Sequence, residues 1–136
     1  MVEQFSGTWV DPVTENMDEY LKEIGIGFVL RKLAKTIKDK AIITIEGNKF
    51  TLISESTFKN HTYVFTFDEK VLVNTIDGRQ HYSILTYKDG EITEEQFPYK
   101  NDIKLSTIKR RIEGGKLVVT MECNGVQAKC VYTRSS

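Results

Sequence analysis

The chain has 136 residues, which is the size of one ordinary domain and too short for two. Its 19 Lys and Arg residues balance 19 Asp and Glu residues, so no net positive field favours a nucleic acid as the partner. The first residues, MVEQFSGTW, lack the basic and apolar regions of a signal peptide and contain no apolar membrane span, so we expect a cytoplasmic protein.

The chain begins with a strand-like run, QFSGTWV, over residues 4–10. Trp9 lies in this run, and we expect it to pack in the core at the closed end of the fold and not to contact a ligand. The run ends where the helical spacing of the next segment begins.

Residues 15–38 have the spacing of two short helices. Asn16 is placed to cap the first helix, which should end at Gly25, and the cations of the second helix should face away from the fold. The expected apolar stripes are Met17, Tyr20, Leu21 and Ile24 in the first helix and Phe28, Val29, Leu33 and Ile37 in the second. A helical hairpin inserted after the first strand has to cover one end of the remaining structure.

From Ala41 onward, short runs rich in Val, Ile, Thr, Tyr and Phe are broken by turn residues every eight to twelve or so positions. Several breaks are Asp-Gly or Asn-Gly pairs, such as residues 77–78 and 124–125, which supply the positive φ values of tight hairpins. The pattern predicts an all-β, antiparallel, up-and-down meander of about ten strands. A sheet of that size closes most simply into a barrel, because closure removes its exposed edges.

The interior of this barrel is expected to be hollow, because ten strands enclose more space than side chains readily fill. Alternation in the last three strands turns the following residues inward: Ile108, Arg110, Ile112, Val119, Met121, Cys123, Ala128, Cys130 and Tyr132. A buried Arg110 needs an internal acid, ordered water or an anionic ligand. A fatty acid carboxylate would satisfy it, with a second hydrogen bond from Tyr132.

The remaining reactive side chains do not form a catalytic or metal pattern. Cys123 and Cys130 stand at unequal distances from their turn, so we expect two buried thiols and no disulfide. His61 and His81 are expected to hold ordered water inside the barrel, since nothing in their spacing places a nucleophile beside a base. We therefore expect no enzymatic activity, no metal and no cofactor.

Five segments together resemble the intracellular fatty acid-binding proteins: GTW at 7–9, ENMDEYLKEIGIGFVLRKLA at 15–34, SESTFKN at 54–60, IDGR at 76–79 and KCVYTR at 129–134. The resemblance covers essentially the whole chain as one lipid-binding domain, residues 1–136. It implies a ten-stranded lipocalin-like (calycin) barrel with a helix-turn-helix cap between the first two strands. It also implies a carrier that moves a long-chain fatty acid between membranes or proteins. The alternatives are a carrier of a retinoid or another lipid, and an enzyme built on a hollow barrel.

The resemblance also implies a site. The family's two arginines and one tyrosine for the carboxylate fall on Arg110, Cys130 and Tyr132, and a thiol at Cys130 cannot supply an arginine's charge. Arg134 or ordered water are the candidate substitutes. Family portal positions fall on Met17, Tyr20, Val29 and Phe58, and the ligand route on Asp77 and Arg79. The apolar wall adds Ile108, Val119 and Met121.

Three cations of the helical segment, Lys22, Arg31 and Lys32, resemble a basic cluster that some members use for nuclear entry or for collision with membranes. The alternative is an ordinary solvated helix face, which is the more common role of such residues. We expect the protein to be a monomer that contacts membranes transiently through its helical cap.

Overall fold

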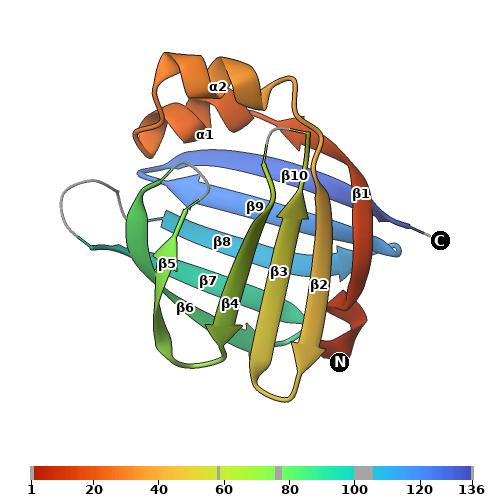
Figure 1. The fold of residues 1–136 in the computed structure, drawn as a ribbon. Coiled ribbons are helices and arrows are strands. Elements are labelled where there is room, and N and C mark those ends of the chain that lie inside the picture. The colour runs from red at the N-terminus through yellow and green to blue at the C-terminus, as the bar shows by residue number, and fades with distance from the viewer. Residues whose placement is uncertain (1, 58, 76–77, 100–105, 136) are drawn as a thin grey trace.

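A computed structural model gives the architecture of the chain and describes residues 2–57, 59–75, 78–99 and 106–135. Ten strands wrap around an interior, and two helices inserted between β1 and β2 cover one end (Figure 1). A short 3-10 helix, Val2–Phe5, precedes the first strand. The strands are β1 Gly7–Glu15, β2 Lys40–Glu46, β3 Lys49–Glu55, β4 His61–Thr66, β5 Lys70–Asn74, β6 Gln80–Lys88, β7 Glu91–Pro98, β8 Ser106–Glu113, β9 Lys116–Cys123 and β10 Val126–Arg134.

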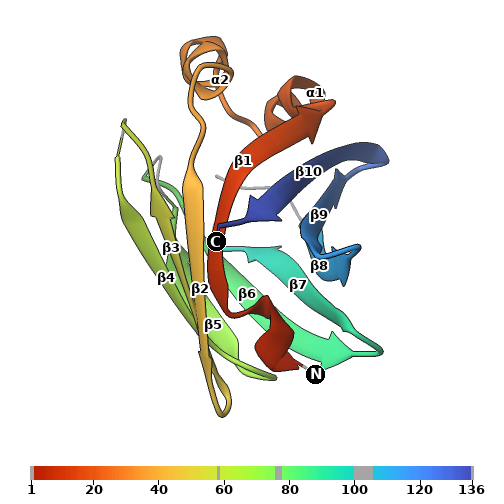
Figure 2. The same cartoon turned by 90° about the vertical axis from the view of Figure 1, so that its right-hand side faces the viewer.

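The strands form one ten-stranded sheet in the order β4-β3-β2-β1-β10-β9-β8-β7-β6-β5. Every neighbouring pair in it is antiparallel, which confirms the predicted meander. Figure 2 shows β1 between β2 and β10, where it joins the first and last parts of the chain. A bulge between Val10 and Val13 bends β1 at this junction.

The predicted closure is incomplete at one place. Within the described residues, β4 and β5 are the two ends of the sheet and share no ladder of hydrogen bonds. In the turn between them, the N–H of Asp68 donates to the carbonyl of Leu85 on β6 at 2.8 Å. A side chain bridges the far end, where His61 Nε2 lies 2.6 Å from the carbonyl oxygen of Asn74. His61 is therefore half-buried at this seam and is not among the described residues that line the cavity. That it holds ordered water stays a prediction.

The hairpin turns follow from their residues. Asn124 and Gly125 have φ values of 49° and 82°, and Cys123 pairs with Val126 across them. Two successive positive φ values produce the twist that suits a two-residue hairpin, and asparagine and glycine adopt them at low cost. The register this sets leaves Cys123 and Cys130 apart, and both are buried free thiols as predicted.

The helical cap differs from the prediction in its details. Helix α1 spans Met17–Glu23 and α2 spans Phe28–Ala34, which is shorter than expected. Asn16 makes no side-chain capping bond to the described helix, because its φ of 58° and ψ of 24° lie in the left-handed region and not in the extended region of a capping residue. Its side-chain amide donates to the carbonyl of Gln127 at 2.7 Å. None of the helices in the described ranges is long and apolar enough to span a membrane.

The expected apolar face of the second helical segment is right for Leu33 and Ile37, which line the cavity, and wrong for Phe28 and Val29. Phe28 and Val29 are 68% and 78% exposed, whereas Leu30, Leu33 and Ala34 face the interior. Leu30, Leu33 and Ala34 are three or four residues apart and share the helix face that is turned to the cavity. Arg31, expected to face away, donates to Asp18 and to the carbonyl of Ile26.

Apolar packing closes the end of the barrel opposite the cap. Trp9 is completely buried there, and its indole N–H donates to the carbonyl of Phe5 at 3.0 Å, as its predicted core position requires. The 3-10 helix carries Phe5 into this cluster. A second cluster lies beneath α1 and contains Tyr20, Ile24, Cys123 and Ala128. The space between the two clusters is left unfilled.

Candidate functional site

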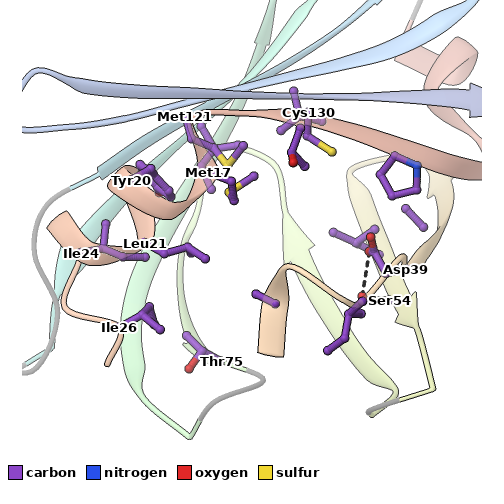
Figure 3. Close-up of a pocket in the computed structure, with 18 of the residues that line it drawn as sticks. Met17, Tyr20, Leu21, Ile24, Ile26, Asp39, Ser54, Thr75, Met121 and Cys130 are labelled. Atoms are coloured by element: carbon purple, nitrogen blue, oxygen red, sulfur yellow. Dashed lines mark hydrogen bonds between the residues drawn. The ribbon is translucent and has the colours of Figure 1, made fainter. Parts of the chain in front are cut away.

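A cavity of about 580 Å³ lies between the cap and the core of the barrel. Its volume falls within the range of about 300–1,000 Å³ that small-molecule sites occupy. Apolar side chains of the cap, such as Met17, Leu21, Ile24 and Ile26, face Met121 and Cys130 on the barrel wall (Figure 3). The cavity can therefore bury a long apolar chain in contact with apolar wall on several sides.

The structure brings most of the predicted site residues to this cavity: Arg110, Tyr132, Cys130, Met17, Tyr20, Arg79, Ile108, Val119 and Met121. Val29 is not one of the described lining residues, because it stands on the outer side of α2. Phe58 and Asp77 lie outside the described residues. Cys123 and Ala128, also expected inside, pack under α1, and Ile112 packs against the core cluster.

Arg110 already has an anionic partner in the protein. Its Nη1 donates to Oε1 of Glu94 at 2.9 Å, and both side chains are buried. Burial alone would raise the pKa of Glu94, but the charge of Arg110 and the hydrogen bonds to the carboxylate lower it to about 2. Of the three partners that the sequence left open for Arg110, the structure contains the internal acid.

Glu94 is the centre of a buried polar network. Its Oε2 accepts hydrogen bonds from Ser83 Oγ and from Gln96 Nε2, both at 2.9 Å. Because Ser83 gives its single hydroxyl proton to Glu94, it must accept the 3.0 Å bond from His81 Nε2. In neutral His81 the other nitrogen, Nδ1, is then an acceptor, and it is buried with no partner among the described residues.

Tyr132 also has a protein partner. Its hydroxyl donates to Oδ1 of Asp39 at 2.8 Å, while Ser54 Oγ donates to Oδ2 of the same carboxylate at 3.0 Å (Figure 3). Burial and the negative charge of Asp39 raise the pKa of Tyr132 well above its ordinary value. The phenol therefore stays protonated, and its proton is committed to Asp39.

Neither Cys130, which stands at the position of the missing arginine, nor the candidate substitute Arg134 supplies a cation to the cavity. Cys130 is buried, and desolvation raises the pKa of its thiol to about 11, so it is neutral at physiological pH. Arg134 donates to the carbonyls of Ser6 and Gln4 and stacks over Trp9 at 4.1 Å. Its guanidinium thus ties the C-terminal strand to the N-terminal segment and does not take part in the cavity.

Two further contacts connect the cap to the barrel around the cavity. The hydroxyl oxygens of Tyr20 and Ser106 lie 2.6 Å apart, and Ser106 donates its proton to the carbonyl of Glu122, so Tyr20 is the donor. Arg79 Nη1 donates to the carbonyl of Ile24 at 3.0 Å. The cap is therefore tied to the barrel on the side of α1.

Sequence reasoning missed Glu94 and Asp39 for different reasons. In the run EITEEQF, the buried Ile92 has the same strand parity as Glu94 and Gln96, so alternation could have placed both polar side chains inside. Asp39 follows α2 in a connecting segment without a periodic pattern, and its partners are 15 and 93 residues away in the chain. No local signal in the sequence identifies it.

The comparison with protein families decides the assignment. Residues 6–135 match the model of the "Lipocalin / cytosolic fatty-acid binding protein family". The chain belongs to this family. Its membership agrees with the barrel, the two helices between β1 and β2 and the interior cavity, and it confirms the prediction of a lipid-binding carrier in place of an enzyme.

Three cavity carboxylates of the described chain, Asp18, Asp39 and Glu94, do not form a metal-binding group.

Individual relatives show the same likeness over nearly the whole chain. The adipocyte fatty acid-binding protein of the penguin Pygoscelis papua is 38% identical over 135 residues, which are 99% of this chain and all of the relative. Lipid binding protein 8 of Caenorhabditis elegans superposes with a TM-score of 0.92 at 29% identity, over 99% and 98% of the two chains. The Schistosoma mansoni fatty acid-binding protein, solved in complex with arachidonic acid, gives 0.88 at 27% identity, over 98% and 97%.

Proposed function

We propose that this protein is a cytosolic carrier that holds one long-chain fatty acid, or a hydrophobic ligand of similar length, in the cavity beneath its helical cap. The observation that carries the proposal is the cavity of about 580 Å³, which apolar side chains from the cap and the barrel wall line. Each buried methylene contributes about 0.8 kcal/mol, so an acyl chain offsets the costs of association. The arachidonic acid complex of the Schistosoma relative supports the ligand class.

Titration of the delipidated protein with oleate is expected to show one saturable site per chain, with an affinity between nanomolar and micromolar. Isothermal titration calorimetry measures both the stoichiometry and the affinity. A negative heat-capacity change should accompany binding, because apolar surface is removed from water. Absence of saturation by oleate and by the uncharged oleyl alcohol, each up to its solubility limit, would contradict the carrier function.

The outer face of α2 supports release at membranes. Phe28 and Val29 are exposed at its first turn, and Lys32 adds an exposed positive charge on the same helix. An amphipathic surface of this kind inserts apolar side chains among lipid headgroups while its cations attract anionic lipids. The proposed transfer step is thus a collision of the cap with the membrane.

Replacing Phe28 and Val29 together by aspartate is expected to slow ligand transfer to anionic vesicles by about tenfold, since the apolar contact with the membrane is lost. A fluorescent fatty acid that is quenched in acceptor vesicles measures the rate. Val64→Asp, at a comparably exposed apolar position on β4, is the control and should transfer at the wild-type rate. Equal rates for the cap variant and the control would contradict transfer by collision.

The three cap cations are not equivalent. Arg31 is committed to Asp18 and to the carbonyl of Ile26, whereas Lys22 and Lys32 are exposed. This arrangement favours a solvated helix face over a free basic cluster. Entry into the nucleus stays a prediction from the resemblance, as does the monomeric state of the carrier.

A further inference from the structure

The hydrogen-bond donors beside Asp39 are already used. Tyr132 donates its only hydroxyl proton to Oδ1 of Asp39, and Ser54 donates its own to Oδ2. A hydroxyl that has given its proton still has oxygen lone pairs, and a carboxylate has about four acceptor sites for these two donors. The group formed by Asp39, Ser54 and Tyr132, which we call the acceptor cluster, therefore presents acceptors to a ligand in the cavity that all three residues line.

The charge of the acceptor cluster is negative and lacks a neutralising partner. Within the part of the chain that the structure describes, no ion pair involves Asp39. Cys130, whose thiol is neutral, adds no positive charge beside Tyr132. A second carboxylate brought to this place would meet like charge and would have to displace Asp39 from the Tyr132 hydroxyl.

Arg110 compensates little of that cost. Its charge is balanced by Glu94 at 2.9 Å, and Glu94 is fixed by Ser83 and Gln96. An added ligand carboxylate would therefore place two negative charges against one guanidinium. The attraction that an unpaired arginine would offer to a fatty acid head group is largely cancelled.

His81 is an independent second observation with the same chemistry. It lines the cavity and is 3% exposed, and its Nδ1 has no partner among the described residues. Because Nε2 donates to Ser83, Nδ1 is the ring nitrogen that is left for a ligand, and in the uncharged form of the ring it accepts a hydrogen bond. Two places in the polar lining can thus accept a hydrogen bond from the head group of a ligand.

We propose that the cavity prefers a long-chain lipid whose head group donates hydrogen bonds, such as a fatty alcohol or fatty amide, over the corresponding carboxylate, and that Asp39 sets this preference. The hydroxyl or amide proton of the ligand binds the free lone pairs of the acceptor cluster. This inference rests on the proposed carrier function and specifies the head group that the same cavity selects.

The test uses three ligands with the same acyl chain: oleyl alcohol, which donates and accepts, methyl oleate, which only accepts, and oleate, which is charged. Delipidated protein competes for each radiolabelled ligand against phosphatidylcholine vesicles. The wild type is expected to bind oleyl alcohol about tenfold more tightly than methyl oleate. Each dissociation constant is first corrected for the partition coefficient of that ligand between water and the vesicles. If the wild type binds oleyl alcohol and methyl oleate with equal affinity, the proposal is overturned, and no variant is needed for this result.

Asp39→Asn removes the charge and keeps the size of the side chain. The variant is expected to bind oleate about tenfold more tightly and oleyl alcohol several-fold more weakly than the wild type. Asp89→Asn is the matched control, because Asp89 is an exposed turn residue outside the cavity and asparagine tolerates its φ of 52°. Equal oleate affinities for the two variants would overturn the role of Asp39.

The outcomes also separate this inference from the function on which it rests. Saturable binding of all three ligands with equal affinity overturns the head-group preference and leaves the carrier function intact. Failure of all three ligands to saturate the wild type overturns both.

Discussion

Arg110→Gln is expected to destabilise the fold by about 3–5 kcal/mol, because it leaves the buried carboxylate of Glu94 without its cation. Most of the lost stability comes from leaving the buried negative charge of Glu94 without a counterion, and not only from losing the contact with Arg110. The double variant Glu94→Gln with Arg110→Gln removes both charges, so it should recover most of the lost stability. Urea denaturation at pH 7 measures the free energy of unfolding of the wild type, the two single variants and the double variant, which together form a double-mutant cycle.

Arg111→Gln provides the control for this cycle. Arg111 is the next residue of β8, and it pairs with Glu91 and Glu113 at the surface. Exposed ion pairs contribute up to about 1 kcal/mol, so this variant should unfold near the wild-type urea concentration. If Arg110→Gln lowers the free energy of unfolding no more than Arg111→Gln does, the buried pair does not have the proposed structural role. The same cycle shows why an Arg110 variant alone is a poor test of ligand anchoring.

The stability of the wild type is expected to fall in acid relative to that of the double variant. The pKa of Glu94 is lowered in the folded protein from 4.5 to about 2, so the ionised group stabilises the native state at pH values above 4.5. That contribution, on the order of 3 kcal/mol, is lost as the pH falls through about 2, because the folded and unfolded states are then both protonated.

Urea denaturation of both proteins at several pH values between 6 and 2.5 tests this expectation. Other carboxylates titrate in both proteins, so the difference between their unfolding free energies isolates the buried pair. We expect the wild type to lose its relative advantage progressively below pH 4.5. A difference that is constant over this range would show that Glu94 titrates alike in the folded and unfolded chain.

The strands of this barrel could be read from the sequence because their signals are local. Turn pairs such as Asn124-Gly125 fix two positive φ values, and the alternation of the flanking residues then fixes which side chains face inward. Arg110, Cys130 and Tyr132 were placed correctly in the cavity by this parity. The helical spacing of residues 15–38 indicated the position of the helical cap, and the family resemblance agreed with it.

The pairing of polar groups inside the barrel could not be predicted in the same way. Asp39 reaches Tyr132 across 93 residues of chain, and only the folded barrel brings them together. The face of α2 depends on how a two-turn helix sits over the cavity, and too few residues are involved for periodicity to fix it. The predicted carboxylate anchor failed to include Asp39 and Glu94 because charge compensation is a property of the assembled interior.

The seam between β4 and β5 gives the barrel an adjustable circumference. In a sheet closed by ladders all round, widening the interior breaks backbone hydrogen bonds between neighbouring strands. Here a side chain, His61, joins the two edges at one end, so the wall can part along one line while all nine ladders of the described strands stay intact. Lipids of different girth can then share one scaffold at the cost of a few side-chain contacts.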